Sequence, residues 1–158
     1  MTWNKKNLAA DEVRTLSARY DLTLLESSIL LRRGVTEGEA LLYYLEDDLR
    51  FAPNPFLFRD MEDVVDRLTG ARDDEEPVLV FGDRDADGIT STVILVEAFR
   101  QQGLKVNWRV PQGDDAYGLT LEAVETFAEA GGGLIVTIDC GISNLKEIAR
   151  AAELGIDV

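Results

Sequence analysis

The sequence predicts an α/β fold, a parallel sheet with helices on both faces, preceded by an N-terminal helical arm. Three observations predict it: short apolar runs alternate with amphipathic segments after residue 77, glycines follow the amphipathic segments, and the chain before residue 72 has helical patterns alone. Strands that alternate with helices form βαβ units with parallel strands. We therefore expect a helical arm at 1–72 and the first part of an α/β domain at 73–158.

The arm contains the patterns of several short helices. The run at 24–33 ends at Gly34, and glycine commonly follows the end of a helix. Thr36 and Glu39 match a capping box in front of an apolar run, so a second helix is expected there. Asp60 is placed to cap a third helix.

The rest of the chain alternates between the two kinds of element. The apolar run at 78–81 is short and continuous, as in strands that are buried on both faces. Residues 156–158 resemble the opening of a fourth strand, so we expect the domain to continue beyond residue 158. The expected strands are 78–81, 106–110 and 134–138, and the expected helices are 89–102, 120–130 and 143–154.

The composition limits the location of the protein. Apolar residues make up 46% of the 158 residues and charged residues 29%, which is ordinary for a globular protein. No run approaches the roughly 18 apolar residues of a membrane span. The single Cys140 has no internal partner for a disulfide. We therefore expect a cytoplasmic location and no membrane partner.

Charge and residue usage also restrict the chemistry. The net charge of −14 argues against a basic nucleic-acid-binding surface on this part of the protein. It does not exclude a nuclease, because bound cations change the sign of the charge around metal-binding carboxylates. The chain contains no histidine, so catalysis or metal binding here must use other side chains.

Aspartates follow two of the expected strands. Asp83, Asp85 and Asp87 come after the first strand, and Asp139 comes after the third. The carboxyl ends of parallel strands meet at one edge of a sheet, where ligands collect. So many like charges are unfavourable together unless a cation neutralises them, and hard oxygen ligands suit Mg²⁺, Mn²⁺ or Ca²⁺. We predict that these four aspartates hold metal ions and carry the catalysis of a phosphoesterase.

Three other interpretations of the motif are weaker. Aspartate and glycine after a strand can simply form a turn, but three alternating aspartates exceed what a turn needs. The spacing also matches half of a calcium-binding EF-hand loop, whose twelfth position would be Ile94 instead of a carboxylate. In a haloacid-dehalogenase-type phosphatase Asp85 would be the nucleophile and Asp87 the acid/base, which leaves Asp83 and Asp139 without a role.

Several residues near the motif are weaker candidates. Ser91 lies in the first turns of the following helix, where it can contact phosphate or simply pack. Tyr117 and Gly118 lie in the loop after the second strand and can line a substrate site. Cys140 is interpreted as a small buried residue, because no base for a nucleophile is in sight.

The motifs together resemble one family. Residues 80–91 closely resemble the first motif of the DHH phosphoesterases, in the form found in RecJ-like single-strand-specific exonucleases. Further similarities cover nearly the whole chain, in the same order and spacing. They lie at 110–111 with 116–119, at 137–143, and in the arm at 30–35 and 53–61.

This resemblance implies a two-metal phosphodiesterase that uses Mn²⁺ or Mg²⁺. It implies digestion of single-stranded DNA from the 5′ end, in DNA repair and recombination. By position, Asp85 and Asp87 match the paired aspartates of the motif, and Asp83 matches a further acidic position. Asp139 matches the aspartate that commonly bridges the two metals. Such metals activate a water molecule and stabilise charge on the attacked phosphate.

The sequence departs from the family pattern in three places. Arg84 stands where tyrosine is usual, and Gln112-Gly113 stands where Asn-Arg is common. The Asp-His-His motif, which normally follows the strand beginning at Ile156, is absent, so we expect this part of the protein to be inactive alone. Two alternatives stay open: another DHH phosphodiesterase acting on short oligonucleotides or cyclic dinucleotides, and a catalytically dead scaffold.

Overall fold

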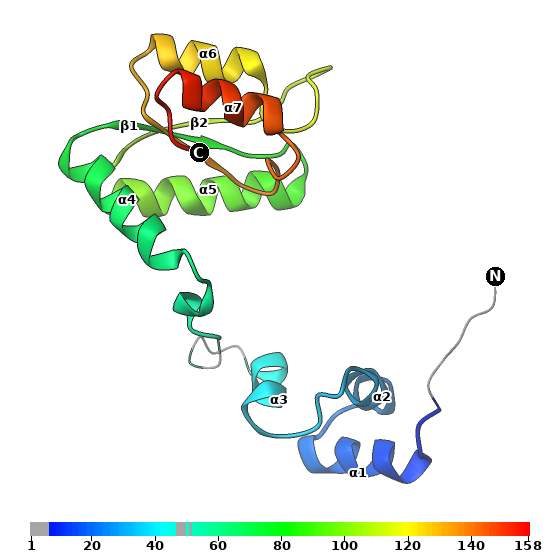
Figure 1. The fold of residues 1–158 in the computed structure, drawn as a ribbon. Coiled ribbons are helices and arrows are strands. Elements are labelled where there is room, and N and C mark those ends of the chain that lie inside the picture. The colour runs from blue at the N-terminus through cyan, green and yellow to red at the C-terminus, as the bar shows by residue number, and fades with distance from the viewer. Residues whose placement is uncertain (1–6, 47–49, 51) are drawn as a thin grey trace. The chain divides into compact units, whose positions relative to one another are not determined.

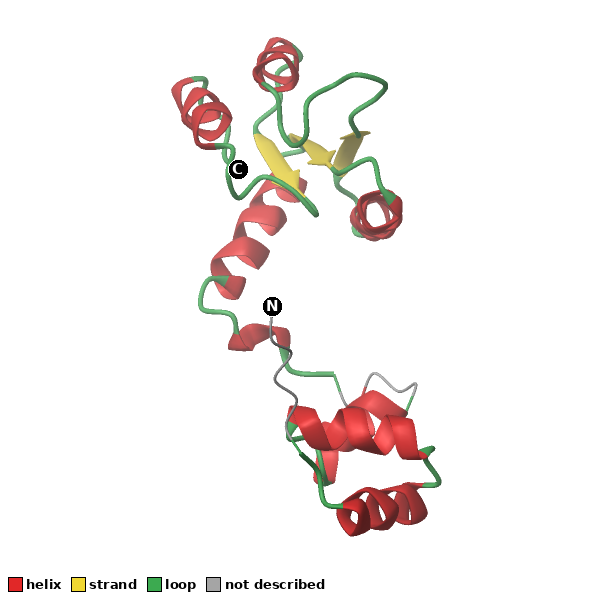
Figure 2. Ribbon diagram, turned by 90° about the vertical axis from the view of Figure 1, so that its right-hand side faces the viewer, coloured by secondary structure: helices red, strands yellow, loops and turns green. Residues whose placement is uncertain are grey.

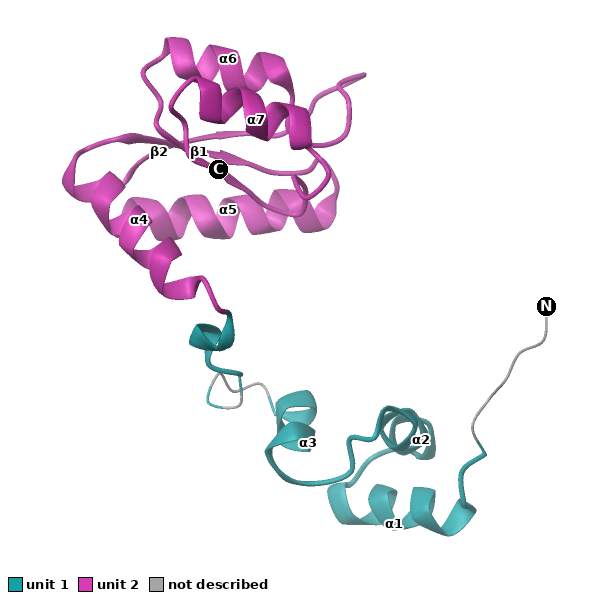
Figure 3. Ribbon diagram, in the orientation of Figure 1, with its two compact units in different colours: residues 1–58 teal, residues 59–158 magenta. Residues whose placement is uncertain are grey.

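The computed structural model describes residues 7–46, 50 and 52–158, and the chain forms two compact units (Figure 3). The first unit is Met1–Phe58 and the second is Arg59–Val158. The division predicted between residues 72 and 73 concerns the domains of the protein and stays a prediction. None of the described helices has the length and apolar character required to cross a bilayer.

The first unit is helical. Its described elements include α1 Ala10–Tyr20, α2 Leu24–Arg33, α3 Gly38–Leu45 and the 3₁₀ helix η2 Pro55–Leu57. One leucine from each α-helix forms a small core, namely Leu16, Leu30 and Leu41. The helix expected at 24–33 is confirmed, and Gly34 ends it in the left-handed conformation, with φ 74°.

The capping box, however, lies elsewhere in this unit. Helix α3 begins after Glu37, and no side chain caps it, so the prediction at Thr36 and Glu39 is wrong. The box forms instead at Thr23 and Glu26, in front of α2. There the Thr23 main-chain N–H donates to the Glu26 carboxylate at 2.8 Å, and the Glu26 N–H donates to the Thr23 hydroxyl at 3.2 Å.

The second unit has the predicted α/β fold, with helices on both faces of a parallel sheet (Figures 1 and 2). The three strands lie in the order β2-β1-β3, and both pairings are parallel. The elements are α4 Met61–Asp73, β1 Pro77–Phe81, α5 Ala86–Gln101, β2 Lys105–Arg109, α6 Leu121–Glu129, β3 Leu134–Thr137 and α7 Leu145–Glu153.

Central strand β1 separates two hydrophobic clusters. Alternate side chains of a strand point to opposite faces, so Val78 and Val80 face one side, and Leu79 and Phe81 the other. The valines pack with residues of α4 and α5, and Leu79 and Phe81 with residues of α6 and α7. In Figure 1 these two pairs of helices lie on opposite sides of the sheet. Since β1 is covered on both faces, its sequence is a continuous apolar run.

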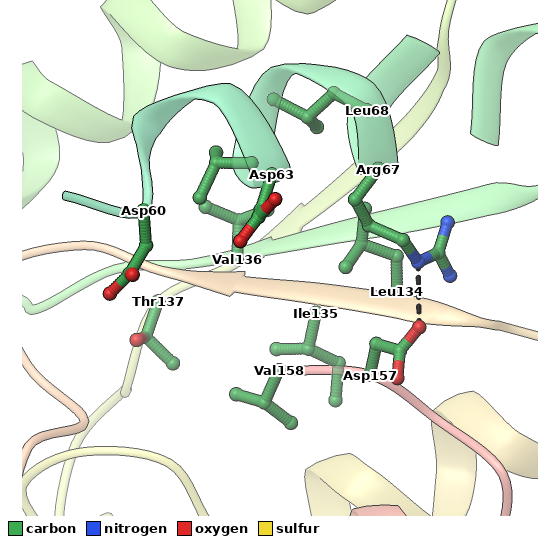
Figure 4. Close-up of a pocket in the computed structure, with 11 residues that line it drawn as sticks. Asp60, Asp63, Arg67, Leu68, Leu134, Ile135, Val136, Thr137, Asp157 and Val158 are labelled. Carbon is green, nitrogen blue, oxygen red and sulfur yellow. Dashed lines mark hydrogen bonds and ion pairs between the residues drawn. The ribbon is translucent and has the colours of Figure 1, made fainter. Parts of the chain in front are cut away.

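The expected opening of a fourth strand forms one parallel bridge beside β3, between Asp157 and Leu134. The Ile135 N–H donates to the main-chain oxygen of Asp157 at 2.8 Å. Arg67 of α4 holds the same segment, because its Nε donates to the Asp157 carboxylate at 2.6 Å (Figure 4). A pocket of about 340 Å³ lies between α4 and β3 at this place.

Candidate metal centre

Two loops meet at the carboxyl ends of β1 and β3. The main-chain pairing continues past the strand ends, because the Ile138 N–H donates to the Phe81 oxygen at 2.9 Å. On the other side of β1, the Gly82 N–H donates to the Arg109 oxygen at 3.0 Å. The loops after β1 and β3 therefore leave the sheet next to each other, as expected at the ligand-binding edge of a parallel sheet.

Three of the four predicted ligands converge at this edge. Asp83, Asp85 and Asp139 each offer a carboxylate oxygen, and these oxygens lie within 4.8 Å of one another. Asp83 is buried, with 7% of its surface exposed, whereas Asp85 and Asp139 are exposed. Three carboxylates this close are a hard, anionic donor set, which fits Mg²⁺ or Mn²⁺.

Hydrogen bonds with the main chain hold the first two carboxylates. The Asp83 carboxylate accepts from the N–H of Arg84 at 2.7 Å. Asp85 is the N-cap of α5, and its carboxylate accepts from the Gly88 N–H at 3.0 Å. The helix therefore begins inside the acidic motif, three residues before the start expected at residue 89. The capping bond stabilises the helix and fixes the Asp85 side chain at the same time.

The glycines of the motif are required by close packing. A Cβ atom on Gly88 would lie 2.5 Å from the main-chain oxygen of Asp83. Gly82 faces Thr92 of α5, whose hydroxyl donates to the Gly88 oxygen at 2.7 Å. Since the first turn of α5 lies directly against the Asp83 backbone, glycine is needed for the buried carboxylate to take its place.

Asp139 has an unusual backbone and an unusual acidity. Its φ of 59° is left-handed, a conformation in which aspartate is enriched among residues other than glycine. The pKa of its carboxyl is raised above the ordinary value, first by partial desolvation and then by the charges of Asp85, Asp87 and Asp83. Tyr117 braces the loop, because its hydroxyl donates to the Asp139 main-chain oxygen at 3.0 Å.

The other predicted site residues lie around this cluster. Asp87 is exposed in the first turn of α5 and is not one of the three converging carboxylates, although its charge acts on Asp139. Ser91 is half-buried on α5. The exposed Tyr117 lines a pocket of about 360 Å³ together with residues 139–143. Gly118 is buried and left-handed, with φ 81°.

Cys140 behaves as a packing residue. Its side chain packs against the cluster that includes Phe81, and its thiol lies 3.6 Å from the Phe81 oxygen. Burial raises the pKa of the thiol above its ordinary value, and the nearby charge of Asp83 adds to this effect. A raised pKa keeps the thiol protonated at neutral pH, which is the opposite of what a nucleophile needs.

Two residues make positioning contacts that the sequence did not predict: Asn144, which was not singled out, and Arg84, which was noted only as a departure from the family pattern. Asn144 Nδ2 donates to the Leu119 oxygen at 2.9 Å, and Asn144 leaves no room for a Cβ atom at Gly118. Arg84 Nη1 donates to the Gly113 oxygen at 2.8 Å. Both contacts attach the loop after β2 to the acidic edge. The sequence offers no signal for either contact, because the acceptors are main-chain oxygens 25 and 29 residues away.

The chain matches a known family over its α/β part. The family model described as "DHH family, N-terminal domain" matches residues 77–158. The single-stranded-DNA-specific exonuclease RecJ of Bacillus subtilis is 31% identical over 159 residues. That similarity covers 100% of this chain and 20% of the relative. The chain therefore spans about a fifth of the length of this curated relative.

Solved structures give the same result. The crystal structure of RecJ in complex with Mn²⁺ from Thermus thermophilus superposes with a TM-score of 0.67 at 26% identity. The superposition covers 94% of this chain and 20% of the Thermus thermophilus chain. A crystal structure of exonuclease RecJ bound to manganese has a TM-score of 0.57 at 32% identity, over 62% of this chain and 26% of that one.

Proposed function

This chain belongs to the DHH family, and from that premise we propose that it is the N-terminal part of a metal-dependent exonuclease that digests single-stranded DNA from the 5′ end. The RecJ relatives support this substrate and this reaction. We propose further that residues 73–158 begin a phosphoesterase domain that continues beyond residue 158, and that residues 1–72 form an arm.

One observation carries the proposal. The carboxylates of Asp83, Asp85 and Asp139 converge within 4.8 Å at the carboxyl edge of the sheet. They come from two loops that are distant in sequence, so their meeting is a property of the fold and not of one local turn. Like charges held this close in the absence of a cation are unfavourable, as the raised pKa of Asp139 indicates.

In the proposed site Asp83, Asp85 and Asp139 hold divalent metal ions, Mn²⁺ or Mg²⁺, with Asp87 as a further ligand from the start of α5. Bound metals of this kind activate a water molecule and stabilise charge on the attacked phosphate. The N–H of Arg84 orients the Asp83 carboxylate, and the N–H of Gly88 orients that of Asp85. Both carboxylates are thereby held before a metal binds, which lowers the entropy lost on binding.

The proposed biological role follows from the substrate. Removal of nucleotides from single-stranded ends belongs to DNA repair and recombination. We propose a cytoplasmic location, as expected for a chain whose single cysteine has no partner for an internal disulfide. We propose that the path of the single-stranded DNA is lined by Ser91, Tyr117 and Gly118. Tyr117 is the best placed of them, because it is exposed and shares a pocket with Asp139.

The decisive experiment compares the full-length protein with its Asp139→Asn variant on single-stranded DNA in Mn²⁺. Asparagine keeps the size of the side chain and tolerates the left-handed backbone, but it removes the charge. Oligonucleotides labelled at the 5′ or the 3′ end report the direction of digestion. We expect the variant to lose at least about a hundredfold in rate, as for the loss of a metal ligand.

Asp66→Asn is the matched control, because Asp66 is an exposed aspartate of α4 outside the cluster. It should leave the rate unchanged. Equal rates for the parent and for Asp139→Asn would exclude the proposed centre. A parent that binds DNA without cutting it in Mn²⁺ or Mg²⁺ would favour the scaffold alternative. Preference for short oligonucleotides or cyclic dinucleotides would favour a different DHH phosphodiesterase.

A further inference from the structure

Arg84 lies inside the acidic motif, between Asp83 and Asp85. Its side chain is exposed, and Nη1 donates to the main-chain oxygens of Gly113, at 2.8 Å, and of Asp115, at 3.5 Å. Both acceptors are neutral carbonyl groups. Among the residues that the structure describes, Arg84 forms no ion pair.

Two arginines on neighbouring elements, Arg109 and Arg150, are held differently. Arg109, at the end of β2, pairs with Glu122 at 3.3 Å. Arg150 of α7 pairs with Glu125 at 3.1 Å and Glu153 at 3.0 Å. These charges are compensated within the protein. The charge of Arg84 is fixed in place by carbonyl groups and stays available to an external anion.

The free part of the guanidinium has the shape that binds phosphate. Arginine carries five N–H donors, and Nη1 supplies the two that contact the carbonyl groups. Within the described part of the chain, Nε and Nη2 of Arg84 have no partner. Two adjacent nitrogens of a guanidinium form the planar fork that binds two oxygens of a phosphate at once.

We propose that Arg84 binds a phosphate of the nucleic-acid strand next to the phosphodiester that is cut. The inference rests on the proposed function, because Arg84 stands between Asp83 and Asp85, two residues of the candidate metal centre. A DNA strand that enters this site meets a protein chain with a net charge of −14. A fixed cation at the carboxyl edge of the sheet is therefore needed to attract and align the DNA. The bonds to Gly113 and Asp115 hold the arginine in place beforehand, which reduces the entropy lost when DNA binds.

The test measures DNA binding by the full-length protein in EDTA, so that neither cleavage nor a metal contributes. The affinity for a fluorescent single-stranded oligonucleotide is measured by anisotropy over a series of NaCl concentrations. Arg84→Gln keeps an amide NH2 group as a hydrogen-bond donor but removes the charge. We expect a roughly tenfold weaker affinity and a salt slope lower by about 0.7, the value for one lost phosphate contact on a single strand.

Three further variants separate charge from loop structure. Arg84→Lys should keep the parent's salt slope, because it keeps the charge. Gln112→Arg, on the exposed start of the same loop, should restore part of the slope when combined with Arg84→Gln. Arg100→Ala is the control: Arg100 is exposed in the last turn of α5, about 21 Å along the helix from its start, and should change nothing.

An unchanged salt slope in Arg84→Gln would overturn the assignment, even if its affinity falls, because the arginine would then only brace the loop. An equal effect of Arg100→Ala would overturn it as well. If the parent protein binds and cuts single-stranded DNA and Arg84→Gln has the same affinity and salt slope, the role of Arg84 alone is refuted. Parent protein that neither binds nor cuts single-stranded DNA refutes the proposed function, and the Arg84 role with it.

Discussion

Two unfavourable features coincide at Asp139, namely a left-handed backbone and a carboxylate on which the charges of three other aspartates act. Its folded-state pKa is raised above the ordinary value of 3.8, so the folded chain retains this proton to a higher pH than the unfolded chain. The stability of the metal-free fold therefore falls as the pH rises from the pKa of Asp139 in the unfolded chain to its higher pKa in the folded chain. Above that interval the stability stays lower. Asp139 is thus placed for binding and not for stability.

Asp139→Asn should raise the melting temperature of the metal-free protein at neutral pH, because it removes this repulsion without straining the backbone. It should also reduce the further rise in melting temperature that Mn²⁺ produces, because a ligand is lost. Thermal melting with EDTA and with Mn²⁺ measures both effects, with Asp66→Asn as the reference. A melting temperature that falls in EDTA would contradict the repulsion at Asp139.

Gly88→Ala should destabilise the second unit by about 1–3 kcal/mol, since its methyl group would collide with the Asp83 backbone. Gly70 gives the matched control, because it lies in α4 with open space around the position of a Cβ atom. Gly70→Ala should stabilise the same unit by about 0.5–1 kcal/mol, the ordinary gain in a helix. Urea unfolding measures both, and equal signs would refute the packing argument.

At the level of elements, one arginine joins α4 to the sheet. Arg67 donates from Nη1 and Nη2 to the two carboxylate oxygens of Glu76, at 2.6 and 3.0 Å, and from Nε to Asp157 at 2.6 Å. The bonds to Glu76 and Asp157 raise the pKa of the guanidinium. About a third of the Arg67 side chain is exposed, so water screens part of the interaction.

Arg67→Ala should lower the free energy of unfolding of the second unit by about 1–2 kcal/mol. It should also increase hydrogen exchange at the Asp157 N–H, which donates to the Gly133 main-chain oxygen next to the Arg67 side chain. The control is Arg72→Ala in the last turn of α4, because Arg72 pairs only with its exposed neighbour Asp73 among the described residues. That variant should stay within about 0.5 kcal/mol of the parent. Equal losses of unfolding free energy in both variants would show that the bonds of Arg67 to Glu76 and Asp157 contribute nothing specific.

Helix boundaries show where sequence patterns are ambiguous. Thr23 with Glu26 and Thr36 with Glu39 both have capping-box spacing, but the structure forms the box at Thr23 alone. A capping box requires the threonine to be extended and its helix to start in the next residue, and packing of the helices decides this. The start of α5 shifted for a similar reason, because the Asp85 carboxylate serves as cap and candidate ligand together.

At the level of the whole molecule, the 158-residue chain by itself should show little or no nuclease activity. It spans about a fifth of its Bacillus relative and contains no histidine, so ligands that the family resemblance implies must come from elsewhere. We expect Mn²⁺-dependent cleavage at least about two orders of magnitude below that of the full-length protein. A quantitative assay of both proteins on labelled single-stranded DNA measures this, and comparable rates would refute it.

The sequence by itself determined the fold class and the motif. Apolar runs such as 78–81 alternate with helical segments, and this is enough for a parallel sheet because each pattern depends on neighbouring residues. It also identified four aspartates at strand ends. The roles of Asp83, Asp85, Asp87 and Asp139 in catalysis stay predictions.

Only the tertiary structure decided which of these groups meet. Asp83, Asp85 and Asp139 converge while Asp87 lies outside the trio, because the pairing of β1 with β3 and the start of α5 set their directions. The structure also decided that Arg84 reaches carbonyl groups across the loop after β2. Contacts between residues 29 or more positions apart depend on how the chain folds back on itself, and no local pattern contains that information.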